Sequence, residues 1–341
     1  MNNKCTVFII PNSNNHGAQN FFKRLHNSIN IQKKFLLVEE GFSIIENIKR
    51  ILAIKEKSFL TLVCTVNSIK LGIIYRLLFP NTKLILRLGN TISREVNRRS
   101  IKYYFIKFFY LLGIKLSSHF IFQSHYMKED FLFFFNLQDH PKFKVIHNGV
   151  PRANKIEIVD PIKEILKEKI NFLLVGSFKP QKGYDILLDA LKTLDSYHQN
   201  ICHFHICGDG EEFNFFKENI LKENLDNLIS LYGNISPNNL YSQADAYILP
   251  SKFEGFSNSL IEALSFGLPS IVSDCPSGNR EVIKENFNGI IFKNLDSIDL
   301  MKKIIFMVEN LDKFNSSLIQ IDTERRFLID NISLEYQEII G

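Results

Sequence analysis

Short apolar runs alternate with helical patterns along residues 1–150 of the chain. The apolar runs have the length of strands, and the segments between them space their apolar residues as helices do. Strands separated by helices imply a parallel sheet with helices on both faces. The expected strands are Val7–Pro11, Lys34–Glu39, Phe59–Val66, Lys83–Leu88, His119–Gln123 and Lys144–Ile146, with helices such as Ala18–Ile29 and Ile69–Leu78 between them.

Turn residues at His147–Pro151 interrupt this pattern, and polar sequence follows as far as Lys169. A second series of strands and helices begins at Asn171. Its expected strands are Phe172–Val175, His203–Cys207, Ile229–Tyr232, Ala246–Leu249, Ser270–Ser273 and Gly289–Phe292. The sequence therefore predicts an α/β chain of two doubly wound domains, residues 1–150 and 168–325, with the boundary between 150 and 168.

Composition places the chain among globular proteins with two cores. It has 341 residues, of which 45% are apolar, and its net charge of +5 is far from the balance of a nucleic-acid binder, so no nucleic-acid partner is expected. The five cysteines form no C-x-x-C pair and predict reduced thiols, as in a cytosolic protein. Cys202–His205 comes nearest to metal-ligand spacing, but alternation along a strand explains it, and no metal site is expected.

Neither a signal peptide nor a transmembrane helix is expected. Met1–Lys4 leads directly into the first strand, which leaves no room for a signal peptide. The longest apolar stretch, Tyr103–Ile114, is shorter than the roughly twenty residues that a transmembrane helix needs. We therefore expect a cytoplasmic protein.

The stretch Glu254–Glu262 follows an apolar run, Ala244–Ser251, that is typical of a buried strand. A short glycine-containing turn after a strand opens a helix, whose first N–H groups lack intrahelical partners and can hold a phosphate. Glu254 is expected at the mouth of this turn, and Glu262 about two helical turns further on, near the same face. Two carboxylates placed in this way suit a bound nucleotide-sugar. The one near the phosphate can bind hydroxyls of the sugar, and the one deeper in the site can bind the ribose hydroxyls. The alternative is two surface glutamates on an ordinary amphipathic helix.

Six segments, taken in order, resemble motifs of the GT4 family of retaining glycosyltransferases. They are Val175–Gly183, Cys207–Glu211, Leu231–Ile235, Glu254–Glu262, Gly267–Val272 and Asp274–Glu281. The resemblance implies the GT-B fold, in which two Rossmann-like domains face each other across a cleft. It further implies that a last helix, about residues 326–341, returns to the N-terminal, acceptor-side domain, while 168–325 binds the nucleotide-sugar.

The resemblance also implies roles for individual residues. Glu254 orients the donor sugar, Lys182 stabilises charge on the leaving diphosphate, and Glu262 binds the ribose hydroxyls. For Lys182 an ordinary solvated loop lysine is the alternative. Further donor-binding residues implied by the motifs are Gly17, Ser177, Lys179, Gly210, Ile235, Gly255, Phe256, Ser257 and Asn258.

Three regions depart from the family pattern. Ser177 stands where many relatives carry arginine, and Lys179 is the candidate substitute. In the loop Asn15–Gln19, which resembles the family's G-G-x-E loop, His16 replaces one glycine and Gln19 replaces the acid. Gly17 still permits close approach of a phosphate; an ordinary strand-to-helix turn is the alternative. Asn90 takes the place of a histidine that contacts the donor sugar, and we assign it to the catalytic set; an Asx-turn or N-cap is equally open.

Basic residues precede an aromatic stretch in the N-terminal half. If Ser93–Ile114 is one helix, its cations fall within a roughly 140° arc. Such a segment suits an anionic membrane surface or a lipid-linked diphosphate acceptor; a core-packed helix with solvated cations is the alternative. The four residues assigned to the acceptor or membrane are Arg94, Arg98, Arg99 and Lys102.

The favoured function is a retaining glycosyltransferase of the hexosyltransferase type (EC 2.4) in bacterial surface polysaccharide biosynthesis. Its partners would be a nucleotide-sugar, expected to be a UDP- or GDP-sugar, and a glycan, lipopolysaccharide or polyprenyl-diphosphate-linked acceptor. No cofactor or metal ion is expected beyond this donor. Peripheral attachment to the inner face of the cytoplasmic membrane is a further expectation. The alternatives are a nucleotide-sugar epimerase of GT-B fold and a non-catalytic partner in a glycosylation complex.

Overall fold

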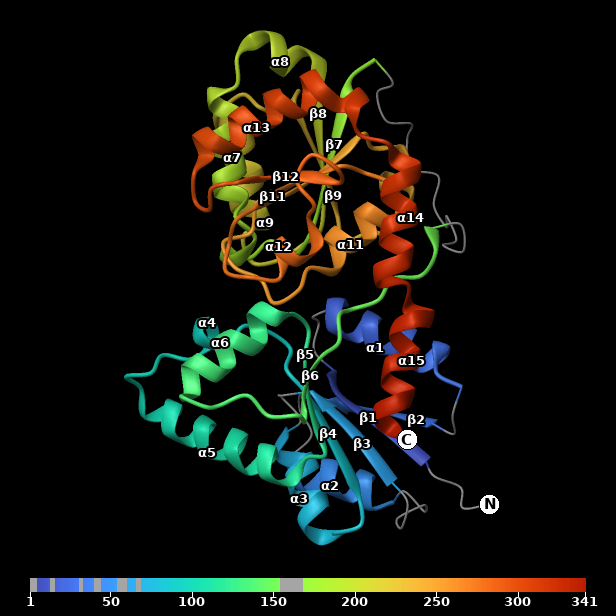
Figure 1. Cartoon of the computed structure of the whole chain (residues 1–341). Helices are drawn as coiled ribbons and strands as arrows, with labels where there is room; N and C mark the ends of the chain where they lie inside the picture. The colour runs from blue at the N-terminus through green and yellow to red at the C-terminus, as the bar shows by residue number, and fades with distance from the viewer. Residues whose placement is uncertain are drawn as a thin grey trace. The chain divides into compact units, whose positions relative to one another are not determined.

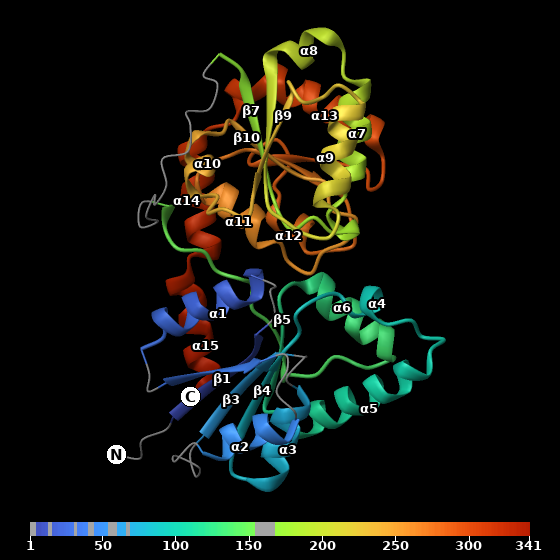
Figure 2. The same cartoon turned by 180° about the vertical axis from the view of Figure 1, so that it is seen from behind.

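The computed structural model of the chain describes residues 5–12, 16–30, 33–39, 44–53, 60–65, 69–153 and 168–341. The chain divides into two compact units (Figures 1 and 2). The first unit is Met1–Gly149 together with Ile329–Gly341, and the second is Val150–Leu328. Most of the expected boundary segment, residues 154–167, lies outside the described residues.

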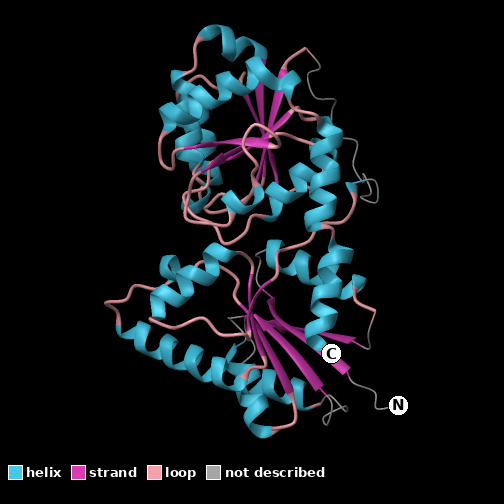
Figure 3. Ribbon diagram, viewed as in Figure 1, coloured by secondary structure: helices cyan, strands magenta, loops and turns pink. Residues whose placement is uncertain are grey.

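The first unit is built on a six-stranded parallel sheet in the order β2-β1-β3-β4-β5-β6, with helices on both faces (Figure 3). Its strands are β1 (Cys5–Asn12), β2 (Lys33–Glu39), β3 (Leu60–Thr65), β4 (Lys83–Arg87), β5 (His119–Phe122) and β6 (Phe143–Val145). Its helices are α1 (His16–Ser28), α2 (Ile44–Leu52), α3 (Ile69–Leu78), α4 (Ile92–Glu95), α5 (Ile101–Leu116), α6 (His125–Phe135) and α15 (Ile329–Ile340).

Buried aromatic rings hold helices to both faces of this sheet. On one face, Tyr110 of α5 and Phe131 of α6 pack on Phe120 of β5, with ring centroids 6.2 Å and 5.1 Å away. On the other face, Phe21 of α1 lies 6.2 Å from Tyr336 of α15. The last helix of the chain is therefore part of the first unit's core.

The chain enters α15 at Ile329, three residues later than the expected start of that helix at residue 326. Arg326 and Phe327 belong instead to the end of α14 (Ser316–Phe327) in the second unit. Leu328 between the two helices is extended and forms a parallel bridge with Val150, which prevents one continuous helix.

Residues Ser93–Ile114 do not form the one helix that the basic arc requires, because the chain breaks between α4 and α5. Val96 is extended, and the Asn97 side chain accepts a hydrogen bond from the Arg99 N–H at 2.9 Å. The Asn97 carbonyl accepts from the Ser100 amide and hydroxyl. Asparagine here offers the backbone a turn in place of a helix, so the expected arc of four cations does not exist.

The second unit holds a six-stranded parallel sheet in the order β12-β11-β10-β7-β8-β9. Its strands are β7 (Ile170–Val175), β8 (Cys202–Cys207), β9 (Ile229–Gly233), β10 (Ala246–Leu249), β11 (Ser270–Ser273) and β12 (Gly289–Phe292). Its helices are η4 (Pro180–Lys182), α7 (Tyr184–Thr193), α8 (Ser196–Ile201), α9 (Phe213–Lys222), α10 (Asn238–Gln243), α11 (Asn258–Ser265), α12 (Asn279–Val282), α13 (Ser297–Asn310), η5 (Leu311–Lys313) and α14.

Each expected strand is present within two residues of its predicted bounds, and strand pairs in the described residues are parallel. This confirms the prediction of an α/β fold with two doubly wound domains. In such sheets ligands bind beyond the carboxyl ends of the strands, so the loops that follow them are where site residues are sought.

A buried polar network lies within the second unit's sheet. His205 of β8 is 2% exposed, and its ring nitrogens lie 2.9 Å from Asn171 Oδ1 and 2.8 Å from Tyr232 Oη. His203 Nε2 lies 2.8 Å from Ser230 Oγ. Burial, aided by the neighbouring His203, lowers the pKa of His205 from 6.5 to about 3. The folded protein therefore keeps this imidazole neutral, with both ring nitrogens hydrogen-bonded.

This depressed pKa predicts acid sensitivity. Below pH 6.5 the unfolded chain protonates residue 205 while the folded chain does not, so the free energy of unfolding should fall as the pH falls from 6.5 towards 3. The contribution is about 1.4 kcal/mol per pH unit. Urea unfolding between pH 4 and 7 measures it. His205→Gln should lower the slope of this dependence by about one proton, which is about 1.4 kcal/mol per pH unit. Equal slopes in the wild type and the variant would contradict the assignment.

Candidate active site

The loop after β7 presents the candidate catalytic lysine. Lys182 is the last residue of η4, which begins with Pro180, and Lys179 precedes it with an exposed side chain. The Phe178 ring is buried and stacks on Tyr184 of α7, with centroids 4.3 Å apart. This stacking fixes both ends of the loop to the second unit's core.

Gly183 brings this loop against the end of β10. Its φ of +69° is in the left-handed region, and a Cβ there would lie 2.1 Å from the Pro250 carbonyl oxygen. Residues with a side chain rarely adopt this conformation, and none could fit so close to a backbone carbonyl. The backbone of the loop after β7 therefore touches the residues that lead to Glu254.

Glu254 and Lys182 form an ion pair at this junction. Lys182 Nζ lies 2.5 Å from Glu254 Oε1, and the Ser251 hydroxyl donates to the same oxygen at 2.9 Å. Gln181 Nε2 donates to Glu254 Oε2 at 3.3 Å. The two charged side chains are 19% and 9% exposed. From the sequence, separate ligand contacts are expected for the two charged residues, and neither Ser251 nor Gln181 is anticipated as a partner.

A second loop, after β8, packs on the first. Gly208 donates its N–H to the Gly233 carbonyl at 2.8 Å. No residue with a side chain fits at this position, because a Cβ on Gly208 would lie 1.9 Å from the Gly176 carbonyl oxygen. The expected donor residue Ser177 follows Gly176 in the first loop, and Gly210 lies exposed two residues after Gly208. Gly176, Gly208 and Gly210 thus place stretches of bare backbone at the carboxyl edge of β7 and β8.

The carboxylate of Glu262 lies on α11, where Tyr241 Oη donates to its Oε2 at 3.4 Å. Glu254 lies in the turn before α11, as expected. The expected spacing of about two helical turns to Glu262 is wrong, because α11 begins only at Asn258, after the extended N-cap residue Ser257. The Glu254 N–H donates to the Pro276 carbonyl at 3.2 Å, so the loop after β11 also holds Glu254 in place.

The other residues of this unit that are expected to bind the donor sugar-nucleotide differ in their burial and in their contacts. Phe256 is buried against Phe327, with ring centroids 5.8 Å apart, so its side chain serves packing. Ser257 is buried at the helix start, 3.2 Å from Ser259 between hydroxyls. Ile235 follows β9, where its carbonyl accepts from the Cys207 thiol. Gly255 accepts at its carbonyl from the Gly278 N–H, and Asn258 opens α11.

In the first unit, Asn90 follows β4 and its side-chain oxygen accepts from the Thr91 N–H at 2.9 Å. This bond joins neighbouring residues and is neither an Asx-turn nor an N-cap, because Thr91 is the N-cap residue of α4, so the role of Asn90 stays a prediction. Gly17 lies in the first turn of α1, and the residues before His16 in that loop lie outside the described residues.

A buried polar chain, not predicted from the sequence, supports the segment before Asn90. Gln123 Nε2 donates to the carbonyls of Leu88 and Gly89 at 2.7 Å and 2.8 Å. Asn148 Nδ2 donates to Gln123 Oε1 at 2.9 Å, and the Arg87 guanidinium donates to Asn148 Oδ1. The available signal in the sequence was an arginine, Arg87, directly after the apolar run Leu84–Leu86 of this strand.

Arg87 is 1% exposed, and its guanidinium lies over the rings of Phe21 and Phe22, 4.4 Å and 5.2 Å from their centroids. Burial lowers the pKa of this arginine. The cation–π contacts and the hydrogen bond to the Asn148 amide offset part of the cost of removing the charge from water. Arg87 thus anchors the polar chain that ends at the Gly89 carbonyl.

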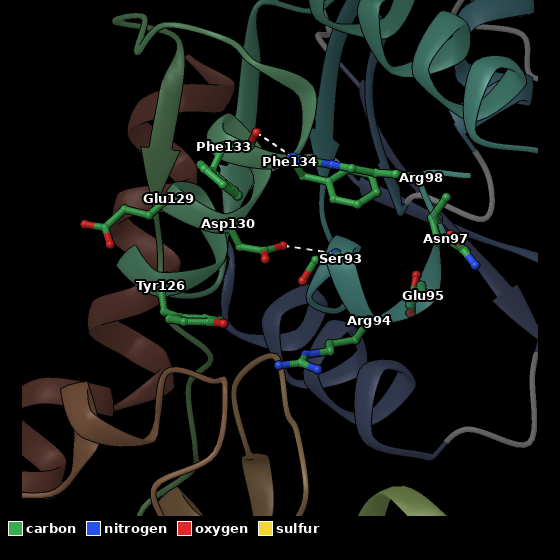
Figure 4. Close-up of a pocket in the computed structure, with 11 residues that line it drawn as sticks. Ser93, Arg94, Glu95, Asn97, Arg98, Tyr126, Glu129, Asp130, Phe133 and Phe134 are labelled. Atoms are coloured by element: carbon green, nitrogen blue, oxygen red, sulfur yellow. Dashed lines mark hydrogen bonds between the residues drawn. The ribbon is translucent and has the colours of Figure 1, made fainter. Parts of the chain in front are cut away.

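A groove of about 890 Å³ lies between α4 and α6 (Figure 4). Arg94 and Arg98 line it together with acidic residues, among them Asp130, whose carboxylate accepts from the Ser93 N–H at 3.1 Å. Arg98 donates to the Phe133 carbonyl at 2.7 Å. Of the four cations expected at an acceptor or membrane, Arg94 and Arg98 share this groove and Arg99 does not line it, while the Lys102 side chain is outside what the structure describes.

The comparisons with known proteins agree with this architecture. The family described as "Glycosyl transferases group 1" matches residues 155–324, which make up most of the second unit. A UDP-Gal:alpha-D-GlcNAc-diphosphoundecaprenol alpha-1,3-galactosyltransferase of Escherichia coli is 34% identical over 173 residues, 47% of this chain and 43% of that protein. The lipopolysaccharide 1,6-galactosyltransferase of Escherichia coli K12 is 31% identical over 199 residues, 54% of this chain and 52% of that protein. The chain thus spans about half the length of these relatives.

Solved structures resemble the whole chain. Anabaena Alr3699/HepE in complex with UDP has a TM-score of 0.77 at 17% identity, and 98% of each chain is covered. A glycosyltransferase from Rickettsia africae ESF-5 has a TM-score of 0.79 at 17% identity, covering 100% of this chain and 98% of that one. The fold is therefore GT-B, as expected from the motifs.

The approach of Gly183 to Pro250 predicts a large cost for a side chain there. Gly183→Ala and Gly233→Ala both place a Cβ in the left-handed region, at about 1–2 kcal/mol each. Only Gly183→Ala adds a backbone clash, because nothing lies within 4 Å of a Cβ at Gly233. Urea unfolding should therefore show about 1–3 kcal/mol more destabilisation for Gly183→Ala. Equal losses in the two variants would show that the two loops do not touch as described.

Proposed function

We propose, because residues 155–324 match the group 1 glycosyl transferases, that this chain transfers a sugar from a nucleotide-sugar to an acceptor in polysaccharide biosynthesis. We further propose the GT4 type, with retention of the anomeric configuration. The observation that carries the proposal is the ion pair between Lys182 and Glu254, at the carboxyl edge of the second sheet.

The pair suits a site that accepts an anion. A donor diphosphate that approaches Lys182 would take the ammonium as its partner, and Glu254 would then accept hydrogen bonds from sugar hydroxyls. Ser251 and Gln181 would keep the carboxylate in place meanwhile. The first-turn N–H groups of α11 would add positive potential beside the phosphates. Lys182 and these N–H groups would together stabilise the charge of the diphosphate.

Retention fits a front-face reaction in this setting. The acceptor oxygen would attack on the face that the leaving diphosphate departs from, and a phosphate oxygen would take the acceptor proton. Lys182 would stabilise the charge that grows on the diphosphate as the glycosidic bond breaks. This sequence of events needs no protein nucleophile.

The donor is proposed to be a UDP-sugar, with a GDP-sugar as the second choice. A related protein is named for UDP-Gal, and a structure of the same fold was solved with UDP. Glu262 on α11 would bind the ribose hydroxyls, and the backbone at Ile235 after β9 would face the base. A hexose, as in the names of the galactosyltransferases, is the proposed sugar.

The acceptor is proposed to be a glycan on a lipid or lipopolysaccharide carrier. The names of two relatives specify a diphosphoundecaprenol-linked and a lipopolysaccharide acceptor. In the first unit, the groove with Arg94 and Arg98 is a candidate for the polar part of such an acceptor, and Asn90 for a contact to the transferred sugar.

The proposal is tested with purified protein in two steps. Thermal stabilisation by UDP, GDP, ADP and CMP identifies the nucleotide, since preferential binding to the folded state raises stability. Sugar conjugates of that nucleotide are then offered with lipid-diphosphate and lipopolysaccharide acceptors, and the product is analysed for its anomeric configuration. Binding without transfer or donor hydrolysis would favour the non-catalytic partner, and an epimerised donor would favour the epimerase.

Lys182→Ala should lower turnover strongly. Loss of a contact that strengthens in the transition state costs on the order of 3 kcal/mol, about a hundredfold in kcat. Lys217→Ala, at an exposed position on α9, is the matched control. Lys179→Ala tests the second candidate cation of the loop separately. The measurement is steady-state transfer by variants that melt cooperatively. A folded Lys182→Ala protein with unchanged kcat would remove the lysine from the mechanism.

Glu262→Gln should weaken nucleotide binding rather than turnover at saturating donor. The lost charged acceptor contributes roughly 1.5–3 kcal/mol, which corresponds to about a tenfold to hundredfold rise in Kd. Glu218→Gln, at an exposed position on α9, is the control. Calorimetric titration measures both. Wild-type affinity in Glu262→Gln would contradict the ribose assignment while leaving the transfer reaction open to the other tests.

A further inference from the structure

Helix α5 exposes a row of large apolar side chains. Ile101, Tyr104, Phe105, Phe108 and Leu111 are 77%, 69%, 64%, 60% and 40% exposed. At about 100° per residue these positions share an arc of roughly 120°, so they form one stripe along the helix, here called the α5 apolar face.

The opposite side of the same helix is firmly packed. Tyr110 is 3% exposed, and a Cβ at Gly113 would lie 2.9 Å from side-chain atoms of both Ile69 and Leu86. Figures 1 and 2 show α5 beside α3 at the outer side of the first unit. A helix that is apolar on all sides is normally buried on all sides. The α5 apolar face is therefore a fixed surface that suits a further apolar environment.

The charged residues in the part of the chain that carries this face are of one sign. No aspartate or glutamate occurs in residues 96–128, whereas Arg99, Lys107 and Lys115 all lie there. Lys115 is exposed and falls within the arc of the apolar face, and Arg99 is exposed just before the helix begins. Exposed aromatic and aliphatic side chains bordered by cations are typical of helices that lie in the interface of an anionic bilayer.

We propose that the α5 apolar face docks the chain on an anionic lipid bilayer, with the helix lying in the plane of the interface. The proposal goes beyond the transfer reaction and does not depend on it. It also replaces the expected basic arc, since Arg94 lines the groove and Arg98 holds α6 through the Phe133 carbonyl. None of the helices in the described part of the chain combines the length and the hydropathy of a membrane span.

Co-sedimentation with vesicles of phosphatidylglycerol and phosphatidylcholine tests the docking. Replacing Tyr104, Phe105 and Phe108 together with glutamine should lower the partition coefficient by on the order of tenfold or more. The matched control replaces Tyr197, Phe215 and Leu221, which are 66%, 69% and 58% exposed on the second unit, with glutamine. The control should bind like wild type. Wild-type binding should weaken on pure phosphatidylcholine and as salt rises.

The absence of tryptophan from the sequence allows a direct probe of insertion. Phe105→Trp and Phe215→Trp each introduce a sole tryptophan at a similarly exposed position. On addition of anionic vesicles the emission of Phe105→Trp should shift to shorter wavelength, and that of Phe215→Trp should not. This readout does not require the triple variant to fold.

Three outcomes would overturn the proposal. One is equal sedimentation of wild type and the α5 triple variant, and another is an emission shift at Phe215→Trp but not at Phe105→Trp. The third is a dimer in sedimentation velocity that the α5 triple variant abolishes while vesicle binding is unchanged, which would assign the face to a second copy of the chain. Transfer to a soluble acceptor is measured in parallel, so that failure of docking and failure of the enzymatic proposal are told apart.

Discussion

At the carboxyl edge of the second sheet, Lys182 and Glu254 lie 2.5 Å apart with little exposure to solvent. Removing two charges from water costs several kcal/mol per ion, and the mutual attraction offsets this only when further hydrogen bonds complete the geometry. Ser251 and Gln181 provide such bonds to the carboxylate. The ion pair therefore fixes the positions of the two side chains more than it adds to the stability of the fold. It holds the Lys182 ammonium where the proposed donor diphosphate would bind.

In the first unit, a different arrangement holds polar groups at the carboxyl edge of the sheet. There, a buried arginine, Arg87, ends a chain of side-chain amides through Asn148 and Gln123 to the Gly89 carbonyl. A neutral side-chain amide can donate one hydrogen bond and accept another. The amides of Asn148 and Gln123 can therefore fix one loop relative to the next without a second buried charge. The loop that carries Asn90 is thus set by residues from three strand ends.

The strands could be predicted from the sequence because each is a short apolar run between turn residues, and that pattern depends on local sequence alone. The ion pair could not, since Lys182 and Glu254 are 72 residues apart and meet through the approach of Gly183 to Pro250. The break after α4 was missed for a different reason. Hydrogen bonds from Arg99 and Ser100 to Asn97 form a turn there, despite the helical periodicity of the residues around it.

Helix α5 shows where sequence patterns stop short of a functional conclusion. Its apolar residues are visible in the sequence, but their number fits a helix buried on all sides as well as one that lies on a membrane. Packing of Tyr110 and Gly113 into the first unit assigns one side to the core, and only then does the opposite side stand out. The structure also separates the cations of this region. Arg98 donates to the Phe133 carbonyl within the unit, whereas Lys115 is exposed on the apolar face, where its charge could meet a bilayer.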